Sequence, residues 1–141
     1  MQIELDTLKT VFGKSPFIMD LGVAPTAVAE GRVTSELTLA PRHFQHTGVV
    51  HAGVMATMAD HTMGAAAQTM APEGHWVLTA ELKTSLLRGA KGERLVCEAH
   101  VLKPGRSVTF TEAEVYAQTA GGERTLVMKA SATMALAPTS R

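Results

Sequence analysis

The feature that most constrains the fold of this chain is a stretch of small and apolar residues, 53–70, that is almost free of charge. Its alanines and methionines are strong helix formers, and Pro72 and Gly74 mark its end. A helix that is apolar on nearly every side is buried. Asp60 and His61 interrupt the stretch and make it too polar for a convincing membrane span. The stretch therefore predicts one long helix at the centre of a core.

Most of the remaining chain has the period of β-strands. Residues 32–39 alternate, with Val33, Leu37 and Leu39 on one face and mostly polar side chains on the other. Strand-like segments follow the helix at 76–87, 95–103, 107–118 and 124–136, separated by the turn-forming pairs Lys91-Gly92, Pro104-Gly105 and Gly121-Gly122. Near the start of the chain, residues 4–12 carry apolar side chains at helical spacing, which predicts a short leading helix within residues 1–15.

One buried helix and one large antiparallel sheet indicate an α+β fold in which the sheet curls around the helix. The length of 141 residues favours a single domain over residues 1–141. A sheet has two faces and two edges, and one helix covers only part of one face. We therefore expect a partner subunit, in a homodimer or in a dimer of dimers.

Composition argues against several classes of protein. With 13 basic and 13 acidic residues and no basic cluster, the sequence indicates no surface for nucleic acid or for a membrane. The single cysteine, Cys97, excludes an intramolecular disulfide framework, and no histidine pattern predicts a metal site. We expect no cofactor. Residues 1–13 lack the basic and apolar regions of a signal peptide, and we expect a cytoplasmic location.

The residues that can carry chemistry gather around the start of the predicted helix. A loop with two glycines, residues 45–53, leads the chain into it. The N-terminus of a helix presents free backbone N–H groups and a partial positive charge, which suit a developing oxyanion. The small residues Ala52 and Gly53 let a carbonyl group approach the backbone closely.

Asp60 lies about two turns into the helix, among apolar residues. A carboxylate in such surroundings is costly unless it is satisfied, and residues placed at that cost are often functional. The alternative is an exposed aspartate or one that caps a neighbouring element. A structural role is the ordinary alternative for His51. His61 points about 100° away from Asp60 around the helix, which makes it a poor partner for that carboxylate.

The pattern Gln45-x-x-Gly48-x-x-His51-Ala52-Gly53, with Asp60 seven residues later, resembles the signature of a known family. The family is that of hotdog-fold acyl-CoA thioesterases of the phenylacetic-acid-degradation type, relatives of the 4-hydroxybenzoyl-CoA thioesterases. The resemblance covers about residues 17–134. It implies the hotdog fold, a curved antiparallel sheet wrapped around one long central helix. It also implies hydrolysis of an acyl-CoA with an aryl or a short- to medium-chain acyl group.

The same resemblance implies a role for each residue of the signature. Asp60 would be the general base or the nucleophile, and Gln45 would orient the thioester or the attacking water. The backbone N–H groups of Ala52 and Gly53 would polarise the thioester carbonyl. His51 would order this loop or contact the carbonyl.

Further along the chain, Thr79 matches a position where relatives carry a serine or threonine that holds the water. The sequence departs from the family pattern at two positions. Ala52 replaces the first glycine of His-Gly-Gly, which narrows the approach to its N–H group, and Gly89 replaces the proline of an Arg-Pro-Ala-like turn. Neither departure removes a catalytic group.

Helix geometry adds an argument for a dimer. Ala52 and Asp60 are eight residues apart, which places them about 12 Å apart along one helix. If both act on one thioester, they must come from two chains whose central helices run side by side and antiparallel. The phosphates of the substrate CoA need cations, for which Arg88, Lys103 and Arg106 are candidates by their position in turns.

Two other functions stay open. A non-catalytic hotdog module that binds acyl-CoA would need no acid on the helix, and the presence of Asp60 with Gln45 and Thr79 argues against it. A hotdog enoyl-CoA hydratase or dehydratase would place its acid differently, and the signature fits a thioesterase better.

Overall fold

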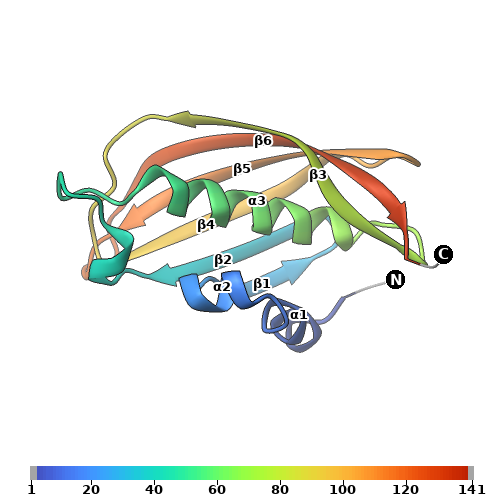
Figure 1. Ribbon diagram of the computed structural model, residues 1–141, viewed down its shortest axis with the longest axis horizontal. Coiled ribbons are helices and arrows are strands. Elements are labelled where there is room, and N and C mark those ends of the chain that lie inside the picture. The colour runs from blue at the N-terminus through green and yellow to red at the C-terminus, as the bar shows by residue number, and fades with distance from the viewer. Residues whose placement is uncertain (1–2, 140–141) are drawn as a thin grey trace.

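The structure, a computed structural model, describes residues 3–139. It is an α+β fold in which a six-stranded antiparallel sheet curves around one long helix, α3 (Figure 1). The helices are α1 Leu5–Phe12, α2 Pro16–Leu21 and α3 Ala52–Gln68, with a short 3₁₀ turn at Pro41–His43. The strands are β1 Ala24–Ala29, β2 Arg32–Thr38, β3 His75–Leu86, β4 Arg94–Lys103, β5 Val108–Gln118 and β6 Arg124–Pro138.

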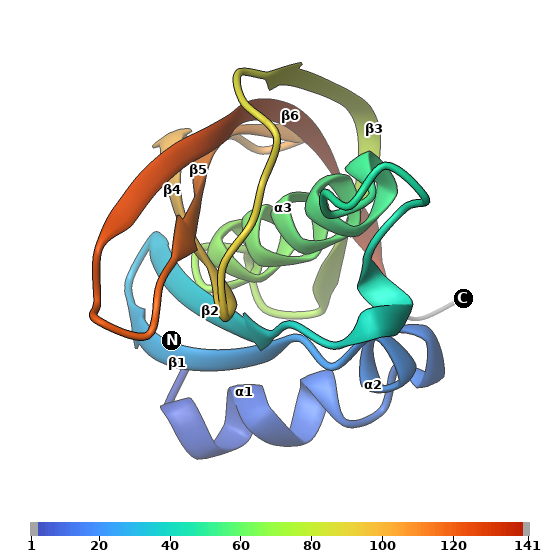
Figure 2. The ribbon, with the colours of Figure 1, turned by 90° about the vertical axis from the view of Figure 1, so that its left-hand side faces the viewer.

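Helix α3 forms the centre of the core, as its composition predicts. The side chains of Met58, Ala59, Met63, Ala66 and Ala67 are completely buried, because they face the concave side of the sheet. Seen end-on, α3 lies inside the curve of the sheet, and one side of the curve stays open between β1 and β3 (Figure 2). The helix residues that are only half-buried, Asp60, His61, Gly64 and Gln68 among them, turn away from this packed face.

A buried polar contact between α3 and β2 fixes the rotation of α3 about its own axis. Thr62 donates a hydrogen bond to the Met58 carbonyl at 2.6 Å, and its hydroxyl lies 2.7 Å from that of Ser35 on β2. Both side chains are fully buried beside Cys97. Burial raises the pKa of the Cys97 thiol to about 12. Because unpaired buried polar groups are costly, rotating α3 away from this setting would be unfavourable.

The strand order is β1-β2-β4-β5-β6-β3, so β3 lies at one edge and pairs only with β6. The Lys91-Gly92 pair therefore does not close a hairpin. It lies in a connection that carries the chain from β3, at the edge, to β4 in the middle of the sheet. Gly121-Gly122 does lie between the paired strands β5 and β6, and Pro104-Gly105 lies between the paired strands β4 and β5.

The N-terminal segment lies along the open side of the sheet. The predicted leading helix is confirmed as α1, with Leu8 and Phe12 buried against the core. Within the predicted range 1–15, residues 1 and 2 lie outside the described residues. The structure adds two elements that we did not predict, helix α2 and strand β1. The sequence of β1, Ala24–Ala29, has no clear alternation of large apolar and polar residues, so its strand character was not evident.

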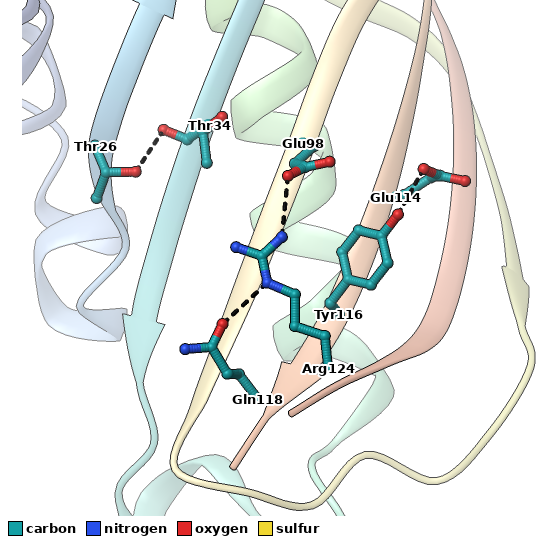
Figure 3. Close-up of polar contacts among 7 residues, drawn as sticks. All are labelled: Thr26, Thr34, Glu98, Glu114, Tyr116, Gln118 and Arg124. Carbon is teal, nitrogen blue, oxygen red and sulfur yellow. Dashed lines mark hydrogen bonds and ion pairs between the residues drawn. The ribbon is translucent and has the colours of Figure 1, made fainter. Parts of the chain in front are cut away.

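The convex face of the sheet carries polar side chains across β4, β5 and β6 (Figure 3). Arg124 donates hydrogen bonds to Glu98 at 3.2 Å and to Gln118 at 3.0 Å, and Tyr116 donates one to Glu114 at 2.8 Å. Exposed ion pairs of this kind add little stability. Their presence shows that this part of the outer face is arranged for contact with water.

Among residues 3–139, none of the helices combines the length and the apolar character needed to cross a membrane.

Candidate active site

The loop before α3 is folded by its own backbone. The N–H of Gln45 donates to the Val49 carbonyl at 2.9 Å, and the N–H of Gly48 donates to the Gln45 carbonyl at 3.0 Å. Gly48 adopts a φ of 87°, a left-handed conformation that glycine tolerates best. The side chain of Gln45 donates to the Thr47 hydroxyl at 2.8 Å. The loop therefore holds Gln45 close to the start of α3.

His51 caps the N-terminus of α3. Its Nδ1 accepts a hydrogen bond from the Gly53 N–H at 2.8 Å. A neutral imidazole that accepts at Nδ1 carries its proton on Nε2. The ring therefore links the end of the loop to the first turn of the helix.

The cap also decides which backbone donor is open. The N–H of Gly53 is engaged by His51, whereas the N–H of Ala52 has no hydrogen-bond partner among the described residues. Ala52 is the first residue of α3, where the N–H groups have no partner within the helix. The donor that remains free for an oxyanion is thus the N–H of Ala52.

Asp60 and Thr79 meet across the space between α3 and β3. The Thr79 hydroxyl donates to Oδ1 of Asp60 at 2.6 Å, and its oxygen lies 3.4 Å from the sulfur of Met134 on β6. A bond this short between a hydroxyl and a carboxylate is of the strong, charge-assisted type. It fixes the carboxylate on the half-buried side of the helix. The sequence alone did not show this contact, because Thr79 is nineteen residues away on another element.

Two adjoining hollows open along this side of α3, and both are lined by Asp60 and His61. The smaller, of about 290 Å³, extends toward the start of the helix between α2 and β3, past Ala56 and Leu82. The larger, of about 370 Å³, extends toward the end of the helix beneath α1. A carboxylate at the junction of two hollows is well placed to act on the middle of an elongated ligand.

The structure gathers the predicted site residues into two groups. Gln45, His51 and Ala52 lie at the N-terminus of α3, whereas Asp60 and Thr79 lie about 12 Å further along it. Within one protomer, the two groups therefore cannot act on the same thioester carbonyl.

The three cations proposed for CoA lie at opposite ends of the sheet. Arg88 lies near the start of α3, because the neighbouring Ala90 carbonyl accepts from the Val50 N–H, and its guanidinium donates to the Leu126 carbonyl at 3.0 Å. Lys103 and Arg106 flank a small hollow at the other end, beside the start of β5. A single protomer cannot use all three on one CoA.

Sequence reasoning set aside His61, and the structure makes it a wall of both hollows. Its ring packs edge-on against Phe12 of α1, with ring centroids 4.3 Å apart. Burial lowers the pKa of His61, and the nearby charge of Asp60 opposes this. Its Nε2 is buried and has no hydrogen-bond partner within residues 3–139. The sequence predicted the leading helix but not its position over α3, so it did not indicate that His61 would be covered.

No cluster of three or more metal-ligating side chains exists in the part of the chain that the structure describes. His43, whose side chain is buried, has a structural role. It accepts from the Ala40 N–H at Nδ1, and its Nε2 lies 2.8 Å from the Leu21 carbonyl.

Comparison with known proteins identifies the family to which the chain belongs. The profile of the thioesterase superfamily matches residues 47–123, which span the start of α3, Asp60 and Thr79. The chain belongs to the thioesterase superfamily. A thioesterase family protein from Silicibacter pomeroyi, whose structure is solved, is 32% identical, with a TM-score of 0.89 over 93% of this chain and 96% of that one.

Two further relatives of this superfamily member show what is shared. The human acyl-coenzyme A thioesterase 13 is 29% identical over 90 residues, which cover 63% of this chain and 64% of the human protein. The chain spans between 54% and 64% of the length of the first curated relatives that it matches. A Haemophilus influenzae thioesterase, at 19% identity and a TM-score of 0.87 over 100% of this chain and 95% of that one, shares the fold. The predicted hotdog architecture of the thioesterase superfamily is thus confirmed.

Proposed function

We propose that this protein hydrolyses acyl-CoA thioesters, with Asp60 as the residue that acts on the thioester or on the attacking water. The observation that carries the proposal is the hydrogen bond from Thr79 to Asp60, which holds a carboxylate at the junction of two hollows on the central helix. The name of the human relative, an acyl-coenzyme A thioesterase, supports the same substrate class. The signature around Gln45 and His51 favours the phenylacetic-acid-degradation type.

The reaction needs no metal, because a thioester is already an activated acyl donor. As a general base, Asp60 takes a proton from water while the water oxygen attacks the carbonyl carbon. As a nucleophile, Asp60 forms an anhydride that water then opens. In both cases the carbon–sulfur bond breaks, CoA leaves as a thiolate that takes up a proton, and the free acid remains. Thr79 keeps the carboxylate in place, and Gln45 orients the thioester or the water.

The developing oxyanion needs a donor, and the open N–H of Ala52 supplies one. A single donor of this kind lowers the barrier by about 3 kcal/mol. Because Ala52 and Asp60 lie on the same helix about 12 Å apart, the donor and the carboxylate of one site must belong to two subunits. We propose a homodimer with two such sites.

Strand β3 is the surface that suits this dimer. It is a sheet edge with unpaired backbone groups, and Leu82 and Leu86 are exposed on it. Pairing two copies of β3 antiparallel would extend the sheet across the dimer and bring the two α3 helices side by side in opposite directions. The N-terminus of one helix would then lie near Asp60 of the other.

The same two-fold arrangement would reunite the candidate cations for CoA. Because β3 runs in opposite directions in the two subunits, the end of the sheet that carries Arg88 would lie near the end of the other subunit that carries Lys103 and Arg106. We propose that the CoA phosphates bind there, between subunits. The dimer would thus explain why one protomer separates these residues.

A second contact surface would serve a dimer of dimers. Large apolar side chains are exposed toward one end of the sheet, among them Trp76, Leu78, Leu102 and Phe110. Exposed apolar groups in such numbers indicate an interaction site. We also propose a reducing, cytoplasmic location, since Cys97 is a free and buried thiol.

Release of free thiol from a panel of aryl and aliphatic acyl-CoAs tests the proposed reaction. Wild type should release thiol, and Asp60→Asn should lower kcat by at least several hundred-fold, since base and positioning are lost together. Binding of acyl-CoA without thiol release would favour the non-catalytic module instead. Hydration of an enoyl-CoA without thiol release would favour the hydratase.

A mixing experiment tests whether the site is shared between subunits. Ala52→Pro removes the open N–H, and proline is well tolerated at the first position of a helix. His51 before it is extended, with φ −62° and ψ 135°, as a residue before proline prefers. Each single variant should be nearly inactive. In an equal mixture with Asp60→Asn, half of the dimers would be mixed, and each would have one intact site of two.

The mixture should therefore regain about one quarter of wild-type activity (one half of the dimers times one half of the sites). Activity no higher than that of the separate variants, under conditions where the subunits exchange, would place the whole site within one subunit. Refolding the two variants together from urea ensures exchange.

A further inference from the structure

The second half of β3 is uncovered on both of its faces. A bulge between Thr79 and Glu81 leaves Ala80 without a partner on β6, and regular pairing with β6 resumes over residues 81–86. All six residues of this run are exposed. Within residues 3–139 no strand lies on its other side, because β3 is the edge of the sheet. A regular, exposed edge strand is a template for pairing with another strand.

The side chains of this run alternate between the two faces of the sheet. Leu82 turns toward α3 and lines the smaller hollow together with Ala56. Lys83 turns to the outer face, where it lines a shallow hollow beside Lys129. Because alternate residues of a strand share a face, Glu81 also turns outward. The run therefore presents an acidic and a basic side chain on its outer face, with a leucine between them on the inner face.

Glu81 and Lys83 are free to bind a partner. Neither takes part in an ion pair among residues 3–139, whereas Lys129 on the neighbouring strand β6 pairs with Glu114 of β5 at 3.4 Å. An opposite charge directly across an antiparallel pair stabilises the pairing, and a like charge destabilises it. The order Glu81-Leu82-Lys83 therefore complements a copy of itself that runs in the opposite direction.

The proposed shared site determines where the two-fold axis of the dimer passes. Ala52 of each α3 must approach Asp60 of the partner subunit, so the two antiparallel helices meet at the residue midway between these positions, Ala56. Ala56 lines the same hollow as Leu82. The axis therefore passes close to Leu82 on β3.

We propose that two copies of β3 pair antiparallel with Leu82 on the two-fold axis, so that Glu81 of each subunit lies opposite Lys83 of the partner subunit. This rests on the proposed function, because the axis follows from a site shared between subunits. The two leucines then meet beneath the paired helices, and two ion pairs lie on the outer face. The order of charges, together with the apolar edge, selects a second copy of this chain as the partner.

Neighbouring registers conflict with the faces of the strand or with its charges. A two-fold axis perpendicular to the sheet keeps inward residues inward, and residues directly opposite one another share a face. The axis must then pass through a residue rather than between two residues. On Glu81 it would set two glutamates opposite each other, and on Lys83 it would set two lysines opposite each other. Because like charges directly opposite are destabilising, Leu82 is the favoured position.

A mixing experiment tests the charge pairs. A homodimer of Glu81→Lys would set lysine opposite lysine in both pairs, and a homodimer of Lys83→Glu would set glutamate opposite glutamate. A dimer of the two variants restores opposite charges in both pairs. The variants are refolded together from urea at low ionic strength, because salt screens exposed charges. One variant carries a heavier tag, so that native mass spectrometry separates the three dimers.

The mixed dimer should make up at least roughly four fifths of all dimers, against one half for random pairing, with each charge pair given only the weakest cross-strand effect. The double variant with both reversals should form homodimers as readily as wild type. Glu30→Lys mixed with Arg32→Glu is the matched control and should give one half. These exposed charges also lie two residues apart, but at the β1–β2 turn on the opposite edge of the sheet. A mixed fraction near one half for the β3 variants would overturn the charge pairing.

Cross-linking tests the position of the axis independently of charge. Cα atoms directly opposite in an antiparallel pair lie about 4.5–5.5 Å apart, within the range of disulfides. Mild oxidation should therefore link the two subunits of Leu82→Cys. Thr84→Cys is the matched control and should stay unlinked, because its two copies would lie more than about 13 Å apart along the strands. Cys97 does not interfere, because it is buried. Any other pattern of linkage would overturn the register.

Failure of the proposed function is a separate result, because both experiments are read without catalysis. If wild type releases no thiol from any acyl-CoA but the subunits of Leu82→Cys link, the register stands and the function fails. If thiol is released and these subunits do not link, the register fails and the chemistry of Asp60 stands. A wild-type protein that stays monomeric would overturn the register and the shared site together.

Discussion

Replacement of Thr79 by valine tests the contact on which the proposed chemistry depends. Valine has nearly the shape of threonine but lacks the hydroxyl that donates to Asp60 at 2.6 Å. A hydrogen bond to a charged group contributes about 1.5–3 kcal/mol. Thr79 is exposed in the protomer and Asp60 is half-buried. Because water competes for this hydrogen bond, we expect a contribution at the lower end of this range. At about 1.4 kcal/mol per factor of ten, kcat should fall roughly tenfold.

The measurement is steady-state thiol release, with kcat and KM determined separately. KM should change little, because the hydroxyl is bound to the carboxylate rather than placed to hold CoA. Thr79→Ser keeps the donor and should retain most of the activity. Thr133→Val, on the neighbouring strand β6, is a matched control outside the hollows. If Thr79→Val turns over as fast as wild type, or faster, the hydroxyl does not position Asp60 and this part of the mechanism is refuted.

Three further predictions follow from buried polar groups. Thr62→Val leaves the buried hydroxyl of Ser35 without its partner at 2.7 Å, and it should lower the free energy of unfolding in urea by about 1–3 kcal/mol; a change within error would mean that this contact does not hold α3. Because burial lowers the pKa of His61 below 6.5, the unfolded chain binds the proton more readily, so stability should be complete above pH 6.5 and fall as the pH drops below it. In His61→Phe, the urea concentration at the unfolding midpoint should decrease less below pH 6.5 than it does in wild type. An equal decrease in both proteins would assign the effect to other groups. The Cys97 thiol, buried and with its pKa raised to about 12, should resist iodoacetamide at about pH 8 until urea unfolds the protein; rapid labelling of the native protein would contradict this burial.

The elements with a strong local period could be predicted from the sequence. The alternation in residues 32–39 placed Val33 and Leu37 in the core, where both are buried, and the nearly uncharged stretch 53–70 corresponds to α3, Ala52–Gln68. Such patterns succeed because one face of a strand or helix must be apolar to be buried. Strand β1 and helix α2 escaped prediction because each is short and has no distinct period, so tertiary contacts decide their conformation.

The candidate site divides in the same way. Gln45, His51 and Asp60 could be named from the sequence, because a glycine-containing loop, a helix N-terminus and a carboxylate among apolar residues each have a chemical meaning within a short segment. The hydrogen bond of His51 to Gly53 lies within that segment too, but its geometry decides that the N–H of Ala52 is the open donor. The eight-residue spacing of Ala52 and Asp60 along one helix is also enough to predict a site shared between two subunits.

By itself, the sequence of this protein determined the central helix, the strands with strong alternation and the chemical character of the loop that leads into the helix, because these depend on neighbours within one or two turns. Only the tertiary structure decided that β3 lies at the edge beside β6, that Thr79 meets Asp60, and that α1 covers His61 and the larger hollow. These contacts join residues far apart in the chain. They follow from how the sheet closes around α3, and no local period of side chains encodes that closure.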